Sequence, residues 1–150
     1  PASEALLQQR VKWMFGKEGL DPNILDICSS NLVFIRSKNA KKLKAIQEYV
    51  GLFCEIHEAI LSIVQPKFII AFSKDYFNFI CNKNTNLTPS QIIERNSGHG
   101  NWKCRMKTIT LDVLDKEVIV ISVPHLSRYK IQNHGKVIEW MSGEIRLAKH

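Results

Sequence analysis

Short apolar runs of the kind found in buried strands alternate along this chain with longer stretches of helical periodicity. Three runs fit a strand covered on both faces, at residues 31–36, 67–72 and 118–123. Between the first two, apolar side chains recur at helical spacing over residues 37–64, and Pro66 ends that segment. A strand, a helix and a second strand in this order predict a right-handed crossover between parallel neighbours.

The remaining elements follow from the same patterns. Further helices are predicted over residues 4–19, 74–81 and 131–148. Residues 106–113 alternate apolar and polar, and the turn at 114–116 joins them to 118–123 as an antiparallel hairpin. Residues 82–103 are expected to be mostly loop. This order predicts a three-layer α/β fold in one domain.

Composition narrows the class of protein. At 150 residues and 45% hydrophobic content, the chain can bury a substantial core. No apolar run approaches the ~18 residues that span a bilayer, so no membrane partner is expected. The cysteines, at positions 28, 54, 81 and 104, include no close pair of the kind a metal site needs. The chain shows no signal peptide, and together with these isolated cysteines this indicates a reducing, cytoplasmic location. We expect neither a metal nor another cofactor.

The charge balance favours a polyanionic partner. Lysine and arginine number 21 against 14 acidic residues, for a net charge of +7 and a pI near 9.4. Basic residues gather at 38–44, at 95–107 and just after His125. The alternative is a protein that is merely basic, and the run at 38–44 is interpreted as a solvated helix face.

One polar residue stands where strand meets loop in each of two predicted strands. Asn31 begins the first strand, and His125 follows the last. Loops at strand ends form the ligand crevice of open α/β sheets, so we expect both side chains to open into a common cavity. An amide that reads a base edge and an imidazole that stabilises charge suit chemistry on a nucleobase.

At these residues the chain resembles the uracil-DNA glycosylase superfamily. The resemblance covers about residues 20–148 and is strongest at 30–37, 66–72 and 118–129. It implies an α/β/α sandwich with a short, mainly parallel central sheet. Asn31 matches a position that offers an amide to uracil in some members. Residues 123–129 match a His-Pro-Ser-type loop, but Leu126 stands where many members have proline.

The family's first motif has no counterpart here. That motif, on an N-terminal strand with a Gly- and Pro-rich loop, supplies the Asp or Asn that positions the attacking water. We therefore expect residues 1–150 to be a single domain of this family without its N-terminal strand and motif, a piece of a longer protein. The cysteine spacing does not fit the iron–sulfur cluster that some relatives carry.

The resemblance implies roles for particular residues. His125 would donate to the base oxygen, and Asn31 would read the uracil edge; otherwise His125 simply ends a strand and Asn31 forms an Asx turn. Leu126, Arg128 and Tyr129 are candidates for the wedge that fills the emptied base stack. Ser127, Arg128 and Lys130 are candidate phosphate contacts. The alternative for this segment is an exposed basic loop.

Two functions from different classes follow. The first is a DNA base-excision N-glycosylase that flips and hydrolyses a uracil-like base from DNA. The second is a catalytically incomplete, basic α/β module that binds nucleic acid. A third, weaker hypothesis is an α/β subunit whose basic face contacts an acidic protein.

Overall fold

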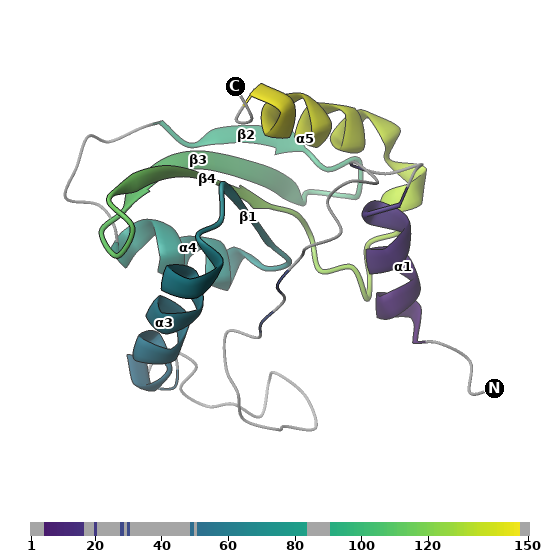
Figure 1. Cartoon of the computed structure of the whole chain (residues 1–150). Helices are drawn as coiled ribbons and strands as arrows, with labels where there is room; N and C mark the ends of the chain where they lie inside the picture. Colours follow the sequence, from purple (N-terminus) through teal and green to yellow (C-terminus); the bar gives the residue numbers. More distant parts are fainter. Residues whose placement is uncertain are drawn as a thin grey trace.

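The computed structural model describes residues 5–16, 20, 28, 30, 49, 51–83 and 91–147. The described helices are α1 (Leu6–Met14), α3 (Cys54–Val64), α4 (Lys74–Lys83), the short 3-10 helix η2 (Ile131–Asn133) and α5 (Gly135–Leu147). The strands are β1 (Phe68–Ala71), β2 (Ile93–Asn96), β3 (Lys103–Leu111) and β4 (Lys116–Ser122). Figure 1 shows the sheet with α5 on one side and α3 and α4 on the other.

The four described strands form one mixed sheet in the order β1-β4-β3-β2. Only β1 and β4 are parallel, with Phe68 opposite Ile119, while β3 is antiparallel to both of its neighbours. The chain is therefore an α/β protein, but the expectation of a mainly parallel sheet is wrong. The physical reason is that β3 and β4 form a hairpin in the middle of the sheet. A second short turn pairs β2 antiparallel with β3, so two of the three described strand pairs are antiparallel.

The predicted hairpin is confirmed. In β3, Cys104 and Met106 are buried on one face of the sheet, and Ile109 and Leu111 are buried on the other. Successive side chains of a strand point to opposite faces, so β3 buries one face in its first half and the other face in its second half, while its pairing with β4 continues without a break. The turn closes with Asp115 in the left-handed region at φ 48°.

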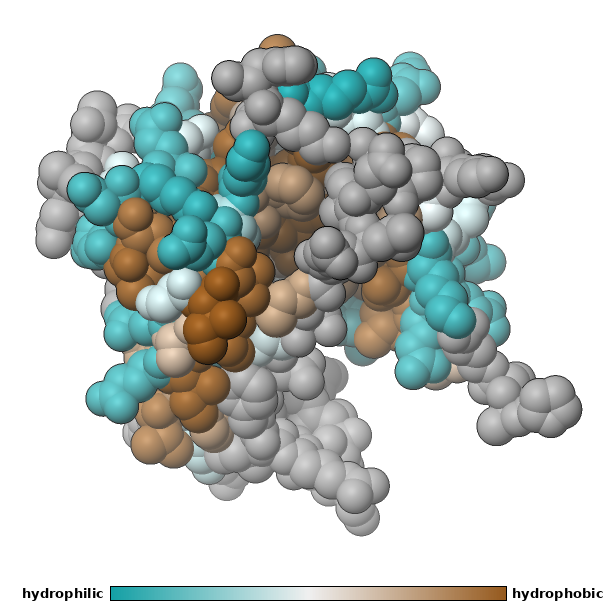
Figure 2. All heavy atoms as spheres, in the orientation of Figure 1, coloured by the Kyte–Doolittle hydropathy of each residue, from teal (hydrophilic) through white to brown (hydrophobic). Residues whose placement is uncertain are grey.

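Two hydrophobic clusters cover the two faces of the sheet. The first joins the sheet to α1 and α5 and includes Met14, Ile121, Tyr129 and Met141. The second joins the sheet to α4 and includes Phe77. A patch of brown spheres in Figure 2 lies over α3, where Ile63 and other apolar side chains are exposed.

The other predicted elements differ mostly at their ends. The strand at 67–72 and the helix at 74–81 match β1 and α4 closely. The last helix begins later than expected, because 131–133 form a separate 3-10 turn. The expected loop at 82–103 contains β2, whose side chains are all exposed and give no apolar pattern. The predicted strand at 31–36 lies outside the described residues.

Within the described residues, no helix is both long and apolar enough to cross a membrane.

Candidate nucleic-acid interface

The segments of interest gather at one end of the sheet. Because β1, β4 and β2 run in the same direction, their carboxyl ends lie together. The segments 72–73, 123–134 and 97–102 leave the sheet there, and α1 packs against η2 beside them (Figure 1). We call these segments, together with α1, the carboxyl face. The turn between β3 and β4 lies at the opposite end.

The segment after β4 alternates buried anchors with exposed polar side chains. The Val123 N–H donates to the Ala71 carbonyl at 3.0 Å, which holds the strand end in the sheet. The N–H groups of Arg128 and Tyr129 then donate to the His125 carbonyl at 3.0 and 3.1 Å, closing one helical turn. Three residues apart on that turn, Leu126 and Tyr129 share one side and both are fully buried. The exposed residues of this one-turn loop and the residue after it are His125, Ser127, Arg128 and Lys130.

These positions correct the expected wedge. Leu126 and Tyr129 are anchors of the fold, 0% exposed, so neither can enter a base stack while the loop keeps this form. The spacing that places both on one side of the turn also directs both into the core beneath α1 and α5. Arg128 is the exposed wedge candidate, and it shares the surface with Ser127 and Lys130.

His125 is held in a defined tautomer. The Ser127 N–H donates to its Nδ1 at 3.2 Å, and the Ser127 hydroxyl lies 2.8 Å from the same atom. Because Nδ1 accepts an N–H, it carries no proton, and the neutral ring has its proton on Nε2. The side chain is exposed, so this Nε2–H is available as a donor to a ligand.

Tyr129 ties the loop after β4 to the β2–β3 turn. Its hydroxyl donates to the Ser97 carbonyl at 2.6 Å, and its ring stacks on His134 with centroids 4.5 Å apart. Burial raises the pKa of Tyr129, with a further contribution from Cys104, so the phenol stays protonated. The two loops of the carboxyl face are therefore held together by a buried hydrogen bond.

The β2–β3 turn brings an aromatic pair to this face. His99 and Trp102 lie with ring centroids 4.8 Å apart, both side chains are exposed, and Lys103 follows directly. Gly98 permits the turn with φ 75°. Exposed aromatic rings beside cations suit stacking on a base. Sequence reasoning missed Trp102, although an aromatic residue within the basic stretch 95–107 was a usable signal.

Partial burial and the neighbouring His99 both lower the pKa of His134, with burial the larger cause. His134 is therefore neutral near pH 7, consistent with its stacking on a neutral phenol.

Among the described residues, carboxylates are distributed unevenly between the two ends of the sheet. Residues 5–16, 97–102 and 122–138 contain no aspartate or glutamate, while they carry cations such as Arg10, Arg128 and Lys130. The opposite turn carries Asp112, Asp115 and, at the start of β4, Glu117. The described segments of the carboxyl face thus carry cations and no carboxylates, a charge pattern suited to a polyanion.

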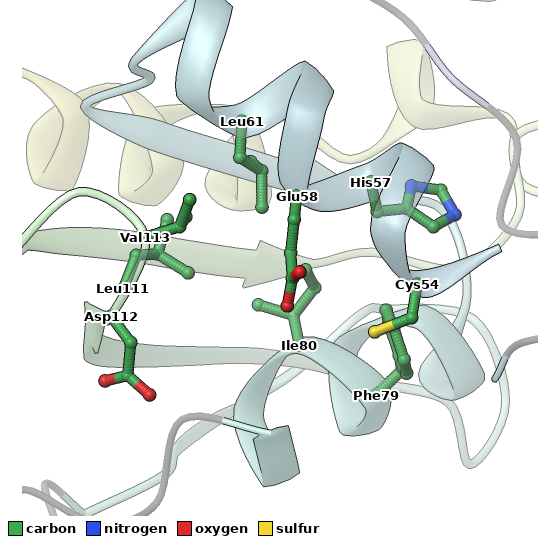
Figure 3. A pocket seen from close by; sticks show the side chains of 9 residues that line it. All are labelled: Cys54, His57, Glu58, Leu61, Phe79, Ile80, Leu111, Asp112 and Val113. Atoms are coloured by element: carbon green, nitrogen blue, oxygen red, sulfur yellow. The ribbon is translucent and has the colours of Figure 1, made fainter.

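A small cavity lies away from the carboxyl face. This cavity has a volume of about 50 Å³ and lies between α3, α4 and the β3–β4 turn. Figure 3 shows the side chains that line it, among them Cys54, His57 and Glu58. His57 is buried, with its ring centroid 5.8 Å from Tyr76 and 6.0 Å from Phe79. His57 therefore belongs to the packed interior between α3 and α4. Among the described residues, no group of three or more His, Cys, Asp or Glu side chains could hold a metal ion.

Asn31 lies outside the described residues, so its expected meeting with His125 stays a prediction.

Comparisons with known proteins found no matching family model and no significant match among curated proteins or solved structures.

Proposed function

We propose that this chain is a uracil-DNA-glycosylase-like domain that acts on a uracil-like base in DNA through its carboxyl face. The observation that carries the proposal is the geometry at His125: its Nδ1 accepts the Ser127 backbone N–H at 3.2 Å, which leaves the ring proton on Nε2 of an exposed side chain after β4. Cleavage of an N-glycosidic bond builds negative charge on the leaving base. A donor aimed at the base oxygen stabilises that charge by about 3 kcal/mol in a site closed to water.

The surroundings of His125 supply the remaining requirements for DNA binding. Ser127, Arg128 and Lys130 are exposed on the same loop and can contact phosphates. Arg128 is exposed and is our candidate for filling the space that a flipped base leaves, and the exposed ring of Trp102 is our candidate for stacking on a base. Asn31 remains the candidate for reading the uracil edge, and Asn31→Asp is then expected to alter base preference.

An excision assay tests the proposal. The substrate is an end-labelled oligonucleotide with one uracil, and the enzyme is the longest natural form of the protein. His125→Ala is expected to lower the single-turnover rate about 100-fold or more. Lys67→Gln, an exposed change at the opposite end of the sheet, is the control and should leave the rate unchanged. Equal rates for His125→Ala and wild type would remove His125 from the reaction.

A specific observation favours the second candidate, a nucleic-acid-binding module without catalysis. Among the described segments of the carboxyl face, none contains a carboxylate that could position a water molecule. A pure binding module should bind uracil- and thymine-containing oligonucleotides with equal affinity and release no base from either. Release of uracil that depends on His125 would decide for the glycosylase.

A further inference from the structure

A polar groove beside the loop after β4 has the composition of an anion site. It lies between α1 and η2, has a volume of about 330 Å³, and is lined by Leu6, Gln9, Arg10, Lys130, Gln132 and Asn133. Apart from Leu6, every one of these residues carries a hydrogen-bond donor, and none is acidic. A groove of this size accommodates a small ligand or part of a larger one.

Arg10 is the group that needs an explanation. Its side chain is on α1, yet the residue is only 6% exposed. One guanidinium nitrogen donates to the Leu126 carbonyl, across 116 residues of sequence. Among the described residues, no carboxylate pairs with Arg10. A buried cation without a counterion is costly, and Arg10 is one of the residues that line the groove.

Among the described residues that line the groove, all charges are positive. Both segments that form it, residues 5–16 and 122–138, contain no aspartate or glutamate. Lys130 adds a second cation from the loop side. An anion bound here would offset the burial of Arg10 and would receive donors from α1 and η2 together. A planar guanidinium and an ammonium suit the oxygens of a phosphate group.

We propose that the groove between α1 and η2 binds a phosphate group, with Arg10 and Lys130 as its charged contacts. This inference rests on the proposed function: the phosphate is a backbone phosphate of the bound nucleic acid. Lys130 lies a few residues after His125 on the same loop, so the phosphate would bind close to the proposed site of the base. The hydrogen bond from Arg10 to the Leu126 carbonyl then connects phosphate binding to the position of the loop that carries His125.

The test uses a variant that leaves the Arg10–Leu126 contact in place. Gln132→Glu puts a carboxylate in the groove, and Gln65→Glu makes the same change of charge at the opposite end of the sheet, where the Gln65 carbonyl accepts from Lys116. The probes are a short single-stranded oligothymidine and inorganic phosphate at constant ionic strength. Binding is followed by fluorescence anisotropy for the first and by ¹⁵N NMR for the second.

Gln132→Glu is expected to weaken oligonucleotide binding about tenfold, because a carboxylate competes for the cations of the groove. The slope of log affinity against log salt should become shallower by about 0.7, the value of one phosphate contact on a single strand. Gln65→Glu should bind as wild type. If Gln132→Glu affects inorganic phosphate alone, the site still binds phosphate, but its source is a small phosphorylated molecule.

The proposal is overturned if Gln132→Glu and Gln65→Glu bind both probes as the wild type does. That failure differs from failure of the proposed function. If the groove does not bind phosphate, uracil excision still depends on His125. If the protein binds nucleic acid but excises no base, Gln132→Glu still lowers its affinity for the oligonucleotide.

Discussion

The hydrogen bond from the Tyr129 hydroxyl to the Ser97 carbonyl joins the loop after β4 to the β2–β3 turn. The substitution Tyr129→Phe removes this hydrogen bond and changes little else. The donor and acceptor lie 2.6 Å apart, and both residues are fully buried. Losing a net contribution of about 1 kcal/mol and leaving a buried carbonyl without a donor lowers the free energy of unfolding by about 2 kcal/mol in total. For a chain of this length that corresponds to a midpoint about 4–8 °C lower.

Chemical denaturation and thermal melting followed by circular dichroism measure this loss. Tyr76→Phe is the matched control, since the structure records no hydrogen bond of the Tyr76 hydroxyl within the described part of the chain; its effect should stay within about 0.5 kcal/mol. Hydrogen exchange adds a local measurement, because the Ser97 and Trp102 amides should exchange faster in Tyr129→Phe. The reasoning is refuted if Tyr129→Phe unfolds at the wild-type midpoint with unchanged exchange in the β2–β3 turn.

Three further predictions concern conformation, acid and thiol chemistry. Gly98→Ala should destabilise the protein by about 1 kcal/mol more than Gly100→Ala. Both glycines have positive φ, 75° and 53°. Of the two, only at Gly98 would an added Cβ contact a neighbouring atom among the described residues, His134 Nδ1 at 2.8 Å. Because the pKa of His134 is lowered in the folded state, its contribution to stability is present above about pH 6.5 and is lost as the pH falls toward the folded pKa. His134→Phe should flatten this acid limb in denaturation curves, and an unchanged limb would refute the assignment. Burial raises the pKa of Cys104 to about 12, so mass spectrometry after thiol labelling at pH 8 should show modification at exposed Cys28 and at Cys104 only after unfolding.

Local patterns in the sequence predicted the hairpin and β1 well. The alternation of β3 and the apolar run of β4 reflect the burial of each strand's own side chains. This burial does not depend on which strands lie beside them, so periodicity alone identifies both strands. The order of strands in the sheet depends on contacts distant in sequence, and the expectation of a mainly parallel sheet failed there. β2 was missed because Ile93 and its neighbours are all exposed and leave no hydrophobic pattern.

The exposure of residues in the loop after β4 was predicted in part, while the roles of these residues stay predictions. The position of His125 after a buried strand followed from sequence, and so did the exposure of Arg128 and Lys130 in a basic loop. The burial of Leu126 and Tyr129 did not, because only the packing of distant helices shows which side of a one-turn loop faces the core. The contact of Arg10 with Leu126 joins residues 116 positions apart, and no local pattern encodes it.

Chemical-shift mapping tests the central claim most directly, namely that nucleic acid meets the carboxyl face. A uracil-containing oligonucleotide is titrated into ¹⁵N-labelled protein at low salt. We predict that the largest shifts fall within residues 97–102 and 123–134, including the Nε2 resonance of His125, and that residues 112–117 stay unchanged. Shifts centred on the acidic β3–β4 turn, or none at a concentration where anisotropy reports binding, would contradict the account.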